Sequence, residues 1–145
     1  MANPNSPILS NPRNRQPVTG NVITFTFDVP SDSDFDKLVF KLDIDTVDTF
    51  NSVNLKTNES RLSADQKTNG KWEVYNGSEF IIMPTGGIGS SYYGNEARLT
   101  IRKQDTDNFP WIDSTWYWKI SAGDGMEYAP VFNQAIYAKV VFTST

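Results

Sequence analysis

Apolar and polar residues alternate along several short stretches of this chain, and this period of two constrains the fold more than any other feature of the sequence. The stretch 22–29 reads VITFTFDV, and the alternation recurs at 38–44, 97–102, 116–122 and 136–143. Because successive side chains of a β-strand point to opposite faces, each stretch has one face for a core and one for solvent. No window of about 11 residues repeats apolar positions at helical spacing. The sequence therefore predicts an all-β protein.

Many short strands joined by turn-rich connectors are typical of a β-sandwich. The 145 residues are the length of one domain. We therefore predict a single antiparallel β-sandwich of about seven to nine strands over residues 21–145. An extended arm rich in Pro and Asn precedes it at 1–20, and residues 7–10 of this arm are suited to an edge strand. The alternation assigns the following residues to the core: Phe25, Phe27, Phe40, Leu42, Leu99, Trp116, Trp118, Ile120 and Val140.

The chain contains no cysteine and no histidine. This composition excludes Ser-His-Asp and Cys-His catalysis, and zinc sites built from nitrogen and sulfur ligands. Carboxylates, Lys, Tyr, Ser and Thr remain for chemistry, and nothing pairs the few Glu residues as a glycosidase would need. We therefore expect a binding or structural protein that is not an enzyme.

Three segments resemble fibronectin type III modules of bacterial proteins. The segment 115–125 reads TWYWKISAGDG and is similar to their sixth strand, whose pattern is roughly TYYWRVxAxDG. The segment 6–12 (SPILSNP), followed by VITFTF at 22–27, looks like their first two strands. FKLDID at 40–45 and TFNS at 49–52 resemble their third strand and the turn after it. The resemblance implies a fibronectin type III or immunoglobulin-like sandwich and implies little about function. Trp116 departs from the family pattern, which usually has a tyrosine there.

Aspartates are concentrated between residues 28 and 48, where seven Asp and two Lys give a local charge of -5. Several of them occupy alternate positions, which would bring their carboxylates to one face of a strand and suit Ca²⁺, a cation that prefers oxygen ligands. The alternative is a solvated acidic surface with turn-forming Asp residues. We expect no cofactor, and calcium at these aspartates is the exception that the sequence leaves open. The candidate ligands are Asp32, Asp34, Asp36, Asp43 and Asp45.

Aromatic residues outside the predicted core are candidates for ligand or partner contact. Trp72, Tyr75 and Trp111 fall at strand ends or in loops, where exposed rings could stack on a sugar. Tyr92 and Tyr93 follow a glycine-rich stretch, and tyrosine is favoured at protein interfaces. The alternative for both tyrosines is a long connection folded back onto the sandwich.

The N-terminal arm offers a second kind of contact, because an extended segment can add a strand to the sheet of a neighbour. Ile8 and Leu9 are its apolar candidates for that role. A short sandwich with such an arm resembles small components of tailed-bacteriophage particles. We therefore expect a non-enzymatic accessory module that contacts other protein subunits of a large assembly, with a phage capsid, tail or baseplate as its setting. The alternatives are a carbohydrate-binding or adhesive module, and one module of a secreted bacterial protein.

Net charge and hydropathy limit the classes of partner that we expect. The net charge is -4 and no basic stripe is present, so we expect no nucleic-acid partner. No apolar stretch approaches the ~20 residues of a membrane span, so we expect no membrane insertion. The first residues lack the basic and apolar regions of a signal peptide. The expected location is the virion, or the cell exterior if a signal or larger frame has been removed.

Overall fold

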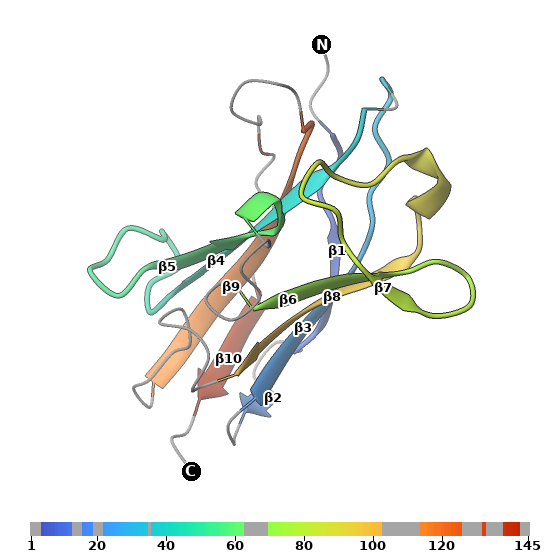
Figure 1. Ribbon diagram of the computed structural model, residues 1–145. Helices are drawn as coiled ribbons and strands as arrows, with labels where there is room; N and C mark the ends of the chain where they lie inside the picture. The colour runs from blue at the N-terminus through green and yellow to red at the C-terminus, as the bar shows by residue number, and fades with distance from the viewer. Residues whose placement is uncertain are drawn as a thin grey trace.

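The computed structural model describes residues 4–12, 16–18, 22–34, 36–62, 70–102, 114–125, 132 and 138–142, and these form two β-sheets that pack face to face (Figure 1). The first sheet has the order β1 (Ile8–Asn11), β3 (Val22–Asp28), β8 (Glu96–Arg102), β6 (Lys71–Tyr75) and β7 (Phe80–Ile82). The second has the order β2 (Gln16–Val18), β10 (Ala138–Phe142), β9 (Ser114–Gly123), β4 (Val39–Asp45) and β5 (Lys56–Glu59). The prediction of an all-β sandwich is confirmed.

Short elements complete the described part of the chain. Two 3₁₀ turns, η1 (Ser60–Leu62) and η2 (Ser90–Tyr92), lie in the connections. Eight of the ten strands have four or more residues, a number within the predicted range, while β2 and β7 have only three residues each. Three residues are too few to display an alternating pattern. None of the helical turns in the described residues is long and apolar enough to cross a membrane.

The strand order is compatible with an immunoglobulin-like sandwich. In such folds the first, second, fifth and fourth strands form one sheet, and the seventh, sixth and third form the other. Here β1, β3, β8 and β6 lie in that order in one sheet, and β10, β9 and β4 lie in that order in the other. All described strand pairs are antiparallel except β2 and β10, which run parallel.

The N-terminal arm contributes an edge strand to each sheet. Its strand β1 pairs with β3 in the first sheet, and β2 pairs with β10 in the second. Pro12, between them, accepts a hydrogen bond from the indole N–H of Trp118 at 3.3 Å. Residues 8–11 and 16–18 of the arm thus pair on one side within this chain, and each is the last strand of its sheet.

The core lies between the two sheets and is rich in aromatic side chains. Phe25 of β3 packs against Trp118 of β9 with ring centroids 4.9 Å apart, and Phe27 packs against Phe40 of β4 at 5.0 Å. Each contact joins one sheet to the other. Almost all of the predicted core side chains are buried: Phe25, Phe27, Phe40, Leu42, Leu99, Trp116, Trp118 and Ile120. The side chain of Val140 lies outside the described ones, although its backbone pairs with Trp116.

Candidate functional site

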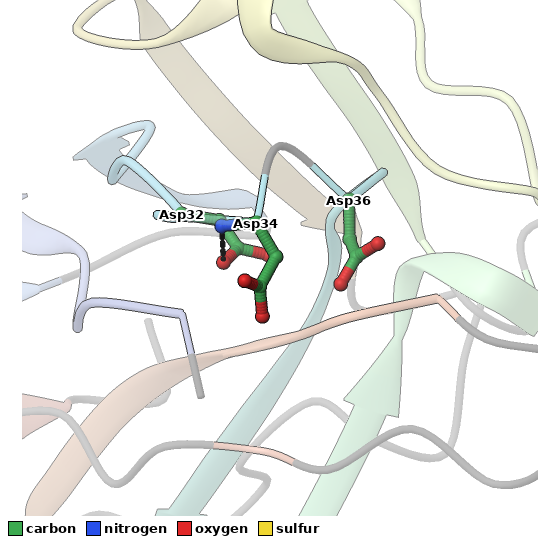
Figure 2. Close-up of side chains that lie close together, drawn as sticks. All are labelled: Asp32, Asp34 and Asp36. Atoms are coloured by element: carbon green, nitrogen blue, oxygen red, sulfur yellow. Dashed lines mark hydrogen bonds between the residues drawn. The ribbon is translucent and has the colours of Figure 1, made fainter. Parts of the chain in front are cut away.

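Three aspartates gather in the connection between β3 and β4. One carboxylate oxygen from each of Asp32, Asp34 and Asp36 lies within 4.8 Å of the others. Figure 2 shows the three carboxylates on the same side of the chain, with the Asp34 N–H donating to Asp32 Oδ1 at 3.0 Å. The sequence placed these residues together because they alternate, as in a strand. In the structure residues 33–34 form a turn, which brings the carboxylates together in a different way.

This acidic cluster is partly buried. Asp32 is only 1% exposed, and the Oδ2 atoms of Asp32 and Asp36 are buried without a hydrogen-bond partner. Asp124, which follows β9, is also buried and brings a fourth negative charge close to Asp36. Burial raises the pKa of Asp36, and the charges of Asp32, Asp34 and Asp124 raise it further. Keeping Asp36 ionised beside three other carboxylates is therefore electrostatically unfavourable.

Two other predicted metal ligands lie elsewhere. Asp43 in β4 forms an ion pair with Lys41 at 3.8 Å. Burial raises the pKa of Asp43, and the positive charges of Lys41 and Lys119 partly oppose this. Among the described residues, only Asp32, Asp34 and Asp36 form a cluster with metal-like spacing. Asp43 and Asp45 therefore lie apart from this cluster, and each has its own partners in or beside β4.

Asp45 organises the turn between β4 and β5. It accepts hydrogen bonds from the backbone N–H of Ser52 at 2.9 Å, from the Ser52 hydroxyl, and from the backbone N–H of Thr46 at 2.7 Å. Although burial alone raises the pKa of Asp45, these hydrogen bonds lower it below the ordinary aspartate value. Phe50 within the turn has a φ of 55° and is buried beneath Lys119, whose ammonium lies 4.4 Å from the ring centre. Asp45 is therefore a structural residue.

The tyrosine loop is folded back on the sandwich. Tyr92 and Tyr93 are half-buried and pack against the core. The Tyr93 hydroxyl donates to the backbone oxygen of Asp32 at 3.4 Å. Burial raises the pKa of Tyr93, and the charge of Asp32 acts in the same direction. Gly94 donates its N–H to the oxygen of Val29 at 2.8 Å, which fixes the loop to the end of β3. Of the two alternatives for this loop, the structure has the folded-back one.

The remaining contact candidates have different environments. Trp72 is fully buried, so the expectation of an exposed sugar platform is wrong for it. The reason is its position in β6, which points Trp72 and Val74 into the core. Leu9 packs against the core, whereas Ile8 beside it is 68% exposed. Trp111 lies outside the described residues.

An exposed apolar and aromatic surface covers the outer face of the first sheet near its edge. This β7 surface consists of Tyr75, Phe80, Ile82 and Arg98. The rings of Tyr75 and Phe80 lie 5.3 Å apart, and the Arg98 guanidinium lies 3.8 Å above the ring centre of Phe80. Tyr75 is 36% exposed and Ile82 is 46% exposed.

Two partly exposed ion pairs centred on Glu73 lie beside the β7 surface on the same sheet face. Arg98 Nε lies 3.0 Å from Glu73 Oε1, and Lys71 Nζ lies 3.6 Å from Glu73 Oε2. Glu73 is buried beneath these two cations, so the guanidinium is held over the ring of Phe80. Of the four residues of the β7 surface, the sequence singled out only Tyr75 as a contact candidate. The other members come from β7 and β8, and only the strand register shows that they are neighbours.

No protein-family model matches the chain, and no curated protein matches it.

Proposed function

We propose that this protein is a non-enzymatic module that docks onto a larger protein assembly through its β7 surface. The single observation that carries the proposal is the exposure of Tyr75 and Ile82 beside Phe80 and Arg98. Tyrosine, phenylalanine and arginine are enriched where protein interfaces are fully buried. Arg98 is already oriented by Glu73, so a partner that covers it orders few additional side-chain bonds.

The backbone at this edge supports the same proposal. β7 is the last strand of its sheet, and none of the strands that the structure describes pairs with its outer side. An open edge is a template for a strand from a partner. Side-chain contacts on the outer face and main-chain hydrogen bonds at the edge would then act together.

We propose further that the fold is of the fibronectin type III or immunoglobulin-like kind found in bacterial and phage modules, and that the assembly is a tailed-bacteriophage particle. Three observations support the family: the strand order, the turn that Asp45 and Ser52 close, and the position of TWYWKISAGDG in the central strand β9. The phage setting, with a capsid, tail or baseplate as the docking site, rests on the resemblance alone.

Carbohydrate binding remains the second candidate, and one specific observation favours it. The Tyr75 ring is exposed beside that of Phe80, and two such rings could stack on a sugar. Arg98 and the exposed Ile82 favour a protein partner instead, because an apolar side chain gains more from a protein surface than from a hydroxyl-rich sugar.

The test compares the incorporation of variants into particles produced by the genome that encodes this chain. The double variant Tyr75→Ser/Ile82→Ser should be at least about tenfold depleted in purified particles, the effect of losing roughly 1.4 kcal/mol of binding. Val53→Ser is the matched control, because Val53 is fully exposed in the turn between β4 and β5. Both variants should melt within a few degrees of the wild type.

Normal incorporation of the double variant would contradict docking through the β7 surface. Absence of the wild-type chain from particles would contradict the phage setting. Soluble polysaccharide that changes the fluorescence of the wild type, but not of Tyr75→Ser, would instead support the carbohydrate alternative.

A further inference from the structure

We propose that Asp32, Asp34 and Asp36 bind a calcium ion in the connection between β3 and β4. These residues are separate from the β7 surface, so the proposal does not depend on the docking function. Of the five candidate ligands in the sequence, the structure retains the three that lie together.

The buried oxygen of Asp32 points to a ligand. Asp32 is 1% exposed, yet its Oδ2 has no hydrogen-bond partner. The Oδ2 of Asp36 is also buried and also has no hydrogen-bond partner. A carboxylate oxygen that is removed from water and left without a partner is energetically unfavourable, and a bound cation would supply the missing contact. In Figure 2 these carboxylates and that of Asp34 are turned to one side, so a single cation placed there would contact all three.

The spacing of the oxygens fits one ion. Two oxygens bound to the same Ca²⁺ at about 2.3–2.6 Å are separated by at most about 4.6–5.2 Å. The three carboxylate oxygens lie within 4.8 Å of one another. The remaining ligands of a six- to eight-coordinate ion would come from second carboxylate oxygens and water.

The charge around the site also favours a cation. Asp124 adds a fourth carboxylate near Asp36, and no Lys or Arg among the described residues forms an ion pair with Asp32 or Asp36. An all-oxygen ligand set selects hard cations such as Ca²⁺ or Mg²⁺ over zinc and copper. Mg²⁺ demands near-ideal octahedral geometry, which three carboxylates from one short loop do not supply, so calcium is the better fit.

The experiment measures the melting temperature of the full chain after EDTA treatment, with and without added calcium chloride. Calcium at about 100 times its Kd should raise the melting temperature of the wild type by about 5–10 °C. Terbium should also become luminescent on binding, because Tyr93 lies next to Asp32 and can transfer its excitation. Asp32→Asn and Asp36→Asn should lose both responses. Asp48→Asn, which makes the same charge change at an exposed position in another turn, should retain them.

A structural role for these aspartates without calcium predicts other results. If the cluster is only repulsive, Asp32→Asn melts at the same or a higher temperature than the EDTA-treated wild type, and calcium changes neither. A melting temperature that does not respond to calcium, or that responds equally in Asp32→Asn, overturns the proposal. An equal response of the wild type to magnesium overturns the assignment to calcium.

Discussion

The indole N–H of Trp72 donates to the side-chain oxygen of Asn58 at 2.7 Å, and this hydrogen bond joins the two sheets. Trp72 belongs to β6 in the first sheet, and Asn58 belongs to β5 in the second. Both residues are buried. A polar contact inside an apolar core requires both partners, because either group left alone would keep an unsatisfied buried atom.

Trp72→Phe should therefore destabilise the fold by about 2–4 kcal/mol, from the lost ring volume and the unpaired oxygen of Asn58. Urea denaturation followed by circular dichroism measures this. Tyr75→Phe, an aromatic change in the same strand but at the surface, should change stability by less than about 0.5 kcal/mol. Equal stability of Trp72→Phe and the wild type would contradict the role given to this hydrogen bond.

Gly87 and Gly86 are neighbours with different tolerance for a side chain. Gly87 has a φ of 100°, and a Cβ there would lie 2.8 Å from the backbone oxygen of Leu38. A Cβ at Gly86 would meet nothing within 4 Å. Gly87→Ala should cost about 2–4 kcal/mol, from backbone strain and displacement of the bridge between Leu38 and Ile88. Gly86→Ala should be nearly neutral in the same denaturation experiment, and similar losses in the two variants would argue against this reading.

Asp45 should make stability depend on pH in the acid range. Its pKa is lower in the folded chain than the ordinary aspartate value of 3.8, because Ser52 and Thr46 donate to the charged form and outweigh burial. A group with a lowered folded pKa stabilises the protein above the unfolded value and loses this effect as the pH falls through the folded value. Asp45→Asn should thus be less stable at pH 7 by about 1–3 kcal/mol, and the difference should shrink below about pH 3.9.

The check on Asp45 is a set of urea midpoints from pH 7 to pH 2.5, with the exposed Asp48→Asn as the control. The control should differ from the wild type by less than about 0.5 kcal/mol at pH 7. A difference between Asp45→Asn and the wild type that stays constant down to pH 2.5 would mean that the charge of Asp45 is not what stabilises the turn.

Removal of the N-terminal arm should destabilise the sandwich. Deleting residues 1–20 removes β1 from one sheet, β2 from the other and the acceptor of the Trp118 indole. We expect a fall in melting temperature of about 10 °C or more, since each lost kcal/mol lowers it by about 2–8 °C. Ile8→Ser, which changes an exposed side chain of the same arm, should leave it within about 2 °C. An unchanged melting temperature after the deletion would show that these strands add nothing to stability.

The sequence predicts the fold where one face of a strand is buried and the other is not. In β3, Phe25 and Phe27 point inward while Thr24 and Thr26 do not, as their alternation requires. Trp72 and Val74 alternate with the polar residues of β6 in the same way. Our placement of Trp72 at a strand end did not use this pattern.

The sites were harder to predict because they depend on the strand register and on turn geometry. The β7 surface joins residues of β6, β7 and β8 whose adjacency follows from pairings such as Tyr75 with Phe80. The aspartates look equivalent in the sequence, but the hydrogen bonds from Ser52 give Asp45 a structural role. The alternation of apolar and polar residues does not show that Ser52, seven residues after Asp45 and across a turn, donates hydrogen bonds to it.

Electron cryo-microscopy of particles produced by the genome that encodes this chain tests the central proposal most directly. The account predicts density for the sandwich at a fixed position, with Tyr75, Phe80, Ile82 and Arg98 covered by a neighbouring subunit. Particles in which the chain is bound while these four side chains face solvent would contradict it.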